Sequence, residues 1–114
     1  MKTAVFSGTT RSQKVGGDGA IFCRTFGGHV SPENAVRAAF EFHRLTASDM
    51  ALPHPEQVVA EVISNGISTV KMDKYSIAFG CEVTLLRDGK IVDYVTSTQD
   101  DWVATVAAVT VSGN

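Results

Sequence analysis

The sequence predicts an α+β protein with a mostly antiparallel sheet and two helices packed on one face, in the order ββααβββ. Strand-like patterns gather towards the two ends of the chain, and two helix-like patterns lie between them. With 114 residues, the chain suits one hydrophobic core, so we expect a single globular domain over residues 1–114.

A β-hairpin over residues 75–97 has the clearest pattern. Larger apolar residues alternate with smaller or polar ones from Tyr75 to Leu85, as in a strand with one face in the core. The dipeptide Asp88-Gly89 follows and is typical of a two-residue type I′ turn.

This turn also predicts the register between the two arms. The opposite pairs are Arg87 with Lys90, Leu85 with Val92, Val83 with Tyr94 and Cys81 with Thr96. Because opposite residues share a face, we expect Val92 and Tyr94 to continue the core face of the first arm.

Two helices are predicted before the hairpin. The first runs through residues 33–45, with Ser31 as N-cap and Pro32 at the first helical position. The second covers residues 55–66, where a proline begins the helix and Asn65-Gly66 ends it.

Residues 7–19 offer little apolar surface, and we interpret them as a loop between a first strand and a second strand at residues 20–26. The glycine cluster at 16–19 precedes a strand rather than a helix, so we expect a turn there and no phosphate cradle.

The C-terminal stretch, residues 98–111, fits either a helix or a strand. Thr98 with Asp101 resembles a helix start, whereas valines and threonines between 103 and 110 favour a strand. We expect a strand, which would be the third of the C-terminal set.

Composition limits the class of protein. The chain is 44% hydrophobic and carries a net charge of −2, as in ordinary globular proteins. No apolar run suggests a membrane span or a secretory signal, so we expect a cytoplasmic protein that does not enter membranes, with a bacterial or phage source fitting its small size. In that compartment we expect Cys23 and Cys81 to be reduced and buried.

The segment from Gly27 and Gly28 to Ser31 joins a strand to a helix, where free amides could bind a small anion or support an enzyme site. It lacks the GxGxxG spacing and the lysine of a P-loop, and Pro32 removes one donor, so this hypothesis ranks third.

No motif supports a reaction class, a metal or a cofactor. The three histidines share no ligand spacing, and a zinc site from Cys23, His29 and Cys81 would lack a closely spaced ligand pair. There is no GxSxG nucleophile motif, and the adjacent Asp100 and Asp101 are typical of a polar turn. These observations favour a protein that is not an enzyme and needs no cofactor.

Nucleic-acid binding is the second functional hypothesis. The first 30 residues contain four basic side chains and one acidic one, whereas the remainder has six basic and eleven acidic. Arg11, Lys14 and Arg24 could contact phosphates if Phe6, Phe22 or Phe26 offered stacking faces on the sheet.

The first hypothesis is a small interaction or accessory protein that acts through protein contacts and self-associates as a homodimer or other homo-oligomer. A sheet edge or an apolar patch would provide the contact. Trp102 is the leading candidate for a surface anchor, because tryptophan is enriched at binding hot spots.

Overall fold

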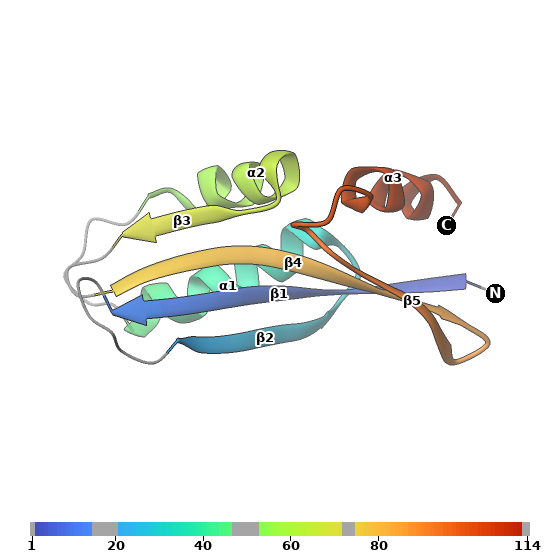
Figure 1. Ribbon diagram of the computed structural model, residues 1–114, viewed down its shortest axis with the longest axis horizontal. Helices are drawn as coiled ribbons and strands as arrows, with labels where there is room; N and C mark the ends of the chain where they lie inside the picture. The colour runs from blue at the N-terminus through green and yellow to red at the C-terminus, as the bar shows by residue number, and fades with distance from the viewer. Residues whose placement is uncertain (1, 15–20, 47–52, 72–74, 113–114) are drawn as a thin grey trace.

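The structure is a computed structural model that describes residues 2–14, 21–46, 53–71 and 75–112. It confirms the α+β class and the order ββααβββ, after which a third helix follows (Figure 1). The elements are β1 Lys2–Lys14, β2 Phe22–His29, α1 Pro32–Thr46, α2 Pro55–Asn65, β3 Ser68–Lys71, β4 Tyr75–Arg87, β5 Lys90–Thr96 and α3 Trp102–Ser112.

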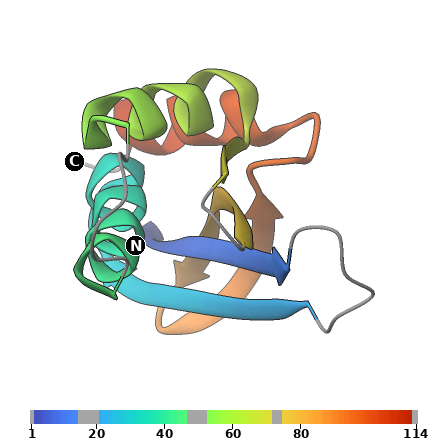
Figure 2. The same ribbon diagram turned by 90° about the vertical axis from the view of Figure 1, so that its left-hand side faces the viewer.

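The five strands form one antiparallel sheet in the order β2-β1-β4-β3, with β5 also paired to β4. The central pair is β1 with β4, which stay in register from Lys2 opposite Arg87 to Lys14 opposite Tyr75. Strands β3 and β5 pair with different halves of β4 along the same edge. Figure 2 shows the helices gathered on one side of the curved sheet, so the other face carries no helix.

Strand β1 is much longer than the sequence predicts. Residues 7–14, which we interpreted as part of a loop, pair along their whole length with β4, and the predicted turn at 16–19 lies outside the described residues. We predicted a loop because residues 7–14 have few apolar side chains, but this strand requires small side chains. Gly8 lies against the backbone of α1, and the alternate residues face the side without helices.

Both predicted helices are confirmed at their boundaries. The hydroxyl of Ser31 accepts a hydrogen bond from the amide of Asn34 at 3.2 Å and so caps α1. Helix α2 begins at Pro55 and ends before Gly66, whose φ of 85° gives the left-handed cap. The N-cap of α2 is His54, whose Nδ1 accepts from the Glu56 amide at 3.3 Å.

The hairpin turn is confirmed, but the predicted register of the second arm is wrong by one residue. Arg87 faces Lys90, and positive φ values at Asp88 and Gly89 fit the type I′ turn. A bulge at Val92 then shifts the pairing, which the contiguous turn register did not anticipate.

Because of this shift, Val95 rather than Val92 or Tyr94 faces the core. Val95 lies opposite Val83 and is buried, whereas Val92 and Tyr94 are about half exposed. A one-residue slip exchanges the two faces of a strand, so the bulge decides which side chains of β5 are buried.

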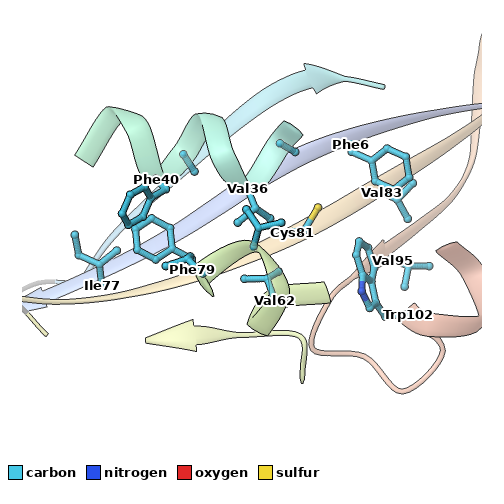
Figure 3. Close-up of a cluster of buried hydrophobic side chains, with 14 of the residues drawn as sticks. Phe6, Val36, Phe40, Val62, Ile77, Phe79, Cys81, Val83, Val95 and Trp102 are labelled. Carbon is cyan, nitrogen blue, oxygen red and sulfur yellow. The ribbon is translucent and has the colours of Figure 1, made fainter. Parts of the chain in front are cut away.

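The core lies between the sheet and the three helices (Figure 3). Alternate residues of β4 point into it, as predicted from Ile77 to Leu85, and Phe79 packs against Phe40 of α1 with ring centroids 5.7 Å apart. Tyr75, at the start of the same alternation, is exposed.

The predicted C-terminal strand is wrong, because residues 102–112 form helix α3. Trp102, Val106 and Val109 share one face of this helix and pack on the core. Tertiary packing of this stripe outweighs the strand propensity of the valines. The third strand of the C-terminal set is instead β3, which the sequence analysis missed.

Trp102 is therefore not a surface anchor in this structure. Its side chain is 3% exposed and meets Phe6 edge to face, with ring centroids 6.5 Å apart (Figure 3). Among the described residues, none of the helices is long and apolar enough to cross a membrane.

Candidate interaction surface

The outer edge of β2 is an exposed backbone edge of the sheet. Within the described residues, β2 pairs only with β1, and it forms the lower margin of the sheet in Figure 1. Residues 22–25 are all exposed. A strand of this kind leaves N–H and C=O groups available to pair with another strand.

An aromatic cluster accompanies this edge on the helix side of the sheet. Phe26 of β2 packs against Phe42 of α1 with ring centroids 5.2 Å apart. The Arg24 guanidinium carbon lies 4.8 Å from the centre of the Phe42 ring, within cation–π range. Phe22 lies two residues further along the same face and is 66% exposed.

His43 forms the floor of this cluster. Its ring meets Phe26 and Phe79 edge to face, with centroids 6.2 Å and 5.8 Å away. Burial, with a smaller contribution from the charge of Arg24, lowers the pKa of His43 below its ordinary value. The imidazole therefore adds a neutral ring to the cluster at neutral pH.

The opposite face of the sheet is rich in hydroxyl groups. A pocket of about 380 Å³ crosses it, lined by residues that include Thr9, Thr25 and Thr96. Gly80 forms part of its floor, and a Cβ there would lie 2.8 Å from the Thr9 hydroxyl oxygen. We call this side of the sheet the hydroxyl face.

One polar pair stands at the β5 side of the hydroxyl face. The Tyr94 hydroxyl donates a hydrogen bond to the Glu82 carboxylate. This hydrogen bond to the anion, together with burial, raises the pKa of Tyr94 to about 12. The tyrosine is consequently a neutral hydrogen-bond donor rather than a base.

The prediction that both cysteines are buried is wrong for Cys23. Cys81 is buried in the core, and burial raises the pKa of its thiol to about 12, but Cys23 is exposed on β2 opposite Arg11. The apolar residues around Cys23 resembled those of a core strand. Strand β2, however, lies at the edge of the sheet. No cluster of three metal-ligating side chains occurs in the part of the chain that the structure describes.

The predicted basic residues do not form one patch. Arg11 lies on the hydroxyl face, whereas Arg24 lies on the helix side over Phe42. Lys14 is exposed at the end of β1. Phe6 is buried, whereas Phe22, on the helix side with Arg24, is exposed.

Gly27 and Gly28 lie inside β2 rather than in a loop before α1. Gly28 has a φ of 89° and ends the regular part of the strand near a bulge. At the start of α1, Ser31 already accepts from the Asn34 and Ala35 amides, and Pro32 has no N–H. Few donors remain there for an anion.

Phe42 is the surface residue that sequence reasoning missed. The signal was available, because Phe42 lies off the helical stripe of Val36, Ala39 and Phe40 that packs on the sheet. Other exposed apolar side chains lie on β5, at Ile91, Val92 and Tyr94, and on α3, at Val103.

Comparisons with protein-family models, curated protein sequences and solved structures gave no match. The site is therefore described by its geometry alone. It is a sheet edge beside an aromatic and cationic cluster, in a two-layer α+β protein.

Proposed function

We propose that this chain is a non-enzymatic interaction protein that self-associates, and that the β2 edge is its contact surface. The observation that supports this most strongly is the open edge of β2, flanked by the exposed Phe22 ring. Edge pairing supplies backbone hydrogen bonds, and neighbouring side chains add apolar contact.

The β2 edge lacks some of the features that prevent strands from pairing. Natural edge strands are protected by proline, lysine, charged side chains that point inward, bulges or short length. Strand β2 has eight residues, no proline and no lysine, but it carries one formal charge, on Arg24 at the helix side, and a bulge near Gly28.

Light scattering after size exclusion tests this proposal. We expect a mass near twice the chain mass of 12.1 kDa, at low and high salt alike, because backbone pairing and apolar contact depend little on ionic strength. A short mixed-sequence single-stranded DNA should leave the mass unchanged. A monomer at all concentrations contradicts self-association, and a mass that shifts with DNA only at low salt supports nucleic-acid binding instead.

Two matched substitutions locate the surface. Phe22→Lys places an ammonium group at the β2 edge and should shift the protein towards monomer, whereas Val30→Lys, at an 85% exposed position outside β2, should not. Val103→Lys tests the exposed apolar side chain of α3. If Val103→Lys dissociates the protein and Phe22→Lys does not, the β2 edge is not the contact surface.

A further inference from the structure

We propose that the outer edge of β3 and the adjacent side of α2 form a groove that binds an extended peptide of another protein, antiparallel to β3 and with the residue order acidic, apolar, polar, basic. This inference goes beyond the proposed self-association and does not depend on it. Strand β3 lies at the opposite edge of the sheet from β2, so the groove stays accessible when copies meet through β2.

A groove of about 260 Å³ lies between β3 and α2. It is lined by all four residues of β3, Ser68–Lys71, by Gln57, Val58 and Glu61 of the helix, and by Pro53 just before the helix. None of these lining residues belongs to β4, the strand with which β3 pairs. The groove therefore lies along the outer edge of β3, which runs beside α2 in Figure 1.

The backbone of this edge has groups available for a further strand. Among the described residues, β3 pairs only with β4, and Ser68–Lys71 form no backbone hydrogen bond outside that pairing. Alternate residues of a strand direct their N–H and C=O groups to opposite edges, so half of those in β3 point away from β4. A peptide that lies in the groove as an added strand would pair with these groups.

The side chains of the groove form an apolar floor and a polar rim. Val58 and Val70 are buried, with exposed fractions of 1% and 6%. Glu61, Thr69 and Lys71 are exposed. An aliphatic side chain of the peptide would cover the two valines, while its polar neighbours stay at the rim in contact with water.

Two charges lie at different ends of the groove. The chain reverses at Gly66, and Glu61 lies five residues before this point, about 7.5 Å along the helix. Ser68 lies about 6.6 Å along the strand and Lys71 about 16 Å, so Glu61 is level with Ser68 while Lys71 lies at the far end. Neither charged side chain forms an ion pair with another described residue.

These positions specify the peptide. Opposite residues of an antiparallel pair share a face, so a carboxylate opposite Lys71 would meet its ammonium group. Three residues later, a basic side chain opposite Ser68 would lie on the helix side, level with Glu61. Between the two charges, the residue opposite Val70 faces the apolar floor and the residue opposite Thr69 faces the exposed side of the sheet.

Lys71 also indicates that the occupant is not a second copy. Lysine on a short edge strand discourages pairing with other strands, and a carboxylate opposite it removes this penalty. Strand β3 contains no acidic residue, and neither does β2. Either strand of a second copy would leave Lys71 without an opposite charge, so the groove fits a different peptide that carries one.

Amide chemical shifts of the full chain, titrated with a synthetic peptide, test the groove. The probe is the acetylated and amidated octapeptide Gly-Ser-Asp-Val-Thr-Lys-Ser-Gly. It should shift the amides of β3 and of residues 57–61 in α2 and leave those of β2 unchanged. Shifts confined to β2, or no shift at millimolar peptide, would overturn the proposal.

The peptide of reversed order, with the same composition, is the control for direction. It cannot place its carboxylate opposite Lys71 and its lysine level with Glu61 while it runs antiparallel to β3, so it should bind about 5-fold more weakly. Equal or tighter binding of the reversed peptide would overturn the antiparallel orientation.

Charge reversal tests the contact at Lys71. Lys71→Glu replaces an attraction by a repulsion and should raise the dissociation constant of the probe about 5- to 30-fold. Lys90→Glu, at an exposed position of β5, should leave it unchanged. A peptide with lysine in place of its aspartate should bind the Lys71→Glu protein more tightly than the wild type. If both peptides bind both proteins equally, the pairing with Lys71 is wrong.

Failure of this inference can be told apart from failure of the proposed function. Light scattering reports on contact through β2, whereas the peptide titration reports on β3 and α2. A monomer whose β3 amides respond to the probe overturns self-association alone. A dimer whose β3 amides do not respond overturns the groove alone.

Discussion

Ser97, just after β5, connects β4 to the C-terminal end of α2. Its hydroxyl accepts from the Cys81 amide at 2.9 Å and donates to the Gly66 carbonyl at 2.6 Å, while its own amide donates to the Cys81 carbonyl at 2.7 Å. Ser97 is buried, and it lies where β3 has left the edge of β4 and β5 has just ended. The hydroxyl therefore hydrogen-bonds to the Cys81 amide and the Gly66 carbonyl at a point where no neighbouring strand is in place to do so.

Ser97→Ala should lower the free energy of unfolding by about 1–3 kcal/mol, because the substitution leaves a buried N–H and a buried C=O without this partner. Urea denaturation measures the change. Ser64→Ala is the matched control, since that exposed hydroxyl bonds only to carbonyls of its own helix, and its effect should stay within about 0.5 kcal/mol. Equal effects of the two substitutions would contradict this role for Ser97.

The two thiols should differ sharply in reactivity. In the folded protein, we expect a disulfide reagent at neutral pH to modify Cys23 quickly and Cys81 only on unfolding, because burial raises the pKa of Cys81 to about 12. Absorbance of the released thiolate counts the reacting groups. Cys23→Ser should remove the fast phase, and a fast phase that survives this substitution would show that Cys81 is accessible.

His43 should make stability depend on pH. Its pKa in the folded protein is below the ordinary value of 6.5, so as the pH falls the unfolded chain takes up a proton first. The free energy of unfolding contributed by this group is complete above about pH 6.5 and declines below it. Denaturation at pH 7.5 and pH 5 should therefore show a smaller loss of stability in His43→Gln than in the wild type, and equal losses would contradict the prediction.

At the scale of elements, the contact between α1 and β1 depends on Gly8. A Cβ at this position would lie 2.2 Å from the carbonyl oxygen of Ala35, a backbone atom of the helix. Gly8→Ala should therefore displace α1 and destabilise the protein by about 1–3 kcal/mol.

Gly27→Ala provides the comparison for this prediction, because its Cβ would meet only the Ser7 side chain, at 3.0 Å. Thermal denaturation of both variants should show the larger loss for Gly8→Ala. A greater effect of Gly27→Ala would mean that the helix does not limit the space above β1.

Elements with local end signals could be predicted from the sequence. Ser31 and Pro32 fixed the start of α1, and Asn65-Gly66 fixed the end of α2, because capping involves only neighbouring residues. The bulge at Val92 and the helical state of residues 102–112 depend on partners distant in the chain. Local pattern therefore identified the hairpin turn but not the side chains of β5 that enter the core.

The candidate surface was predictable only in part. The sequence analysis named Arg24 and a sheet edge separately, but the strand order that makes β2 the edge is a property of the whole sheet. Phe42 reaches Arg24 only because α1 crosses behind β2. For the same reason Trp102, attractive as an isolated residue, proved to be a core residue.

At the scale of the whole molecule, the sheet is stable at its centre and open at its margin. Hydrogen exchange should be slowest for amides of β1 and β4, which are paired on both sides over much of their length, and faster in β2. If two copies pair through β2, its protection should rise with protein concentration while that of β4 does not. Mass spectrometry of peptides from both strands measures this, and concentration-independent protection of β2 would contradict edge pairing.

The pairing of β1 with β4 also has a consequence for how the chain folds. Their partners are about 60 to 85 positions apart in the sequence, so the central ladder closes only after the loop through both helices has been organised. During synthesis, the N–H and C=O groups of β1 that pair with β4 stay exposed until the chain has been synthesised as far as β4. During translation, the early β1–β2 ribbon is thus the part of this protein most in need of protection from aggregation.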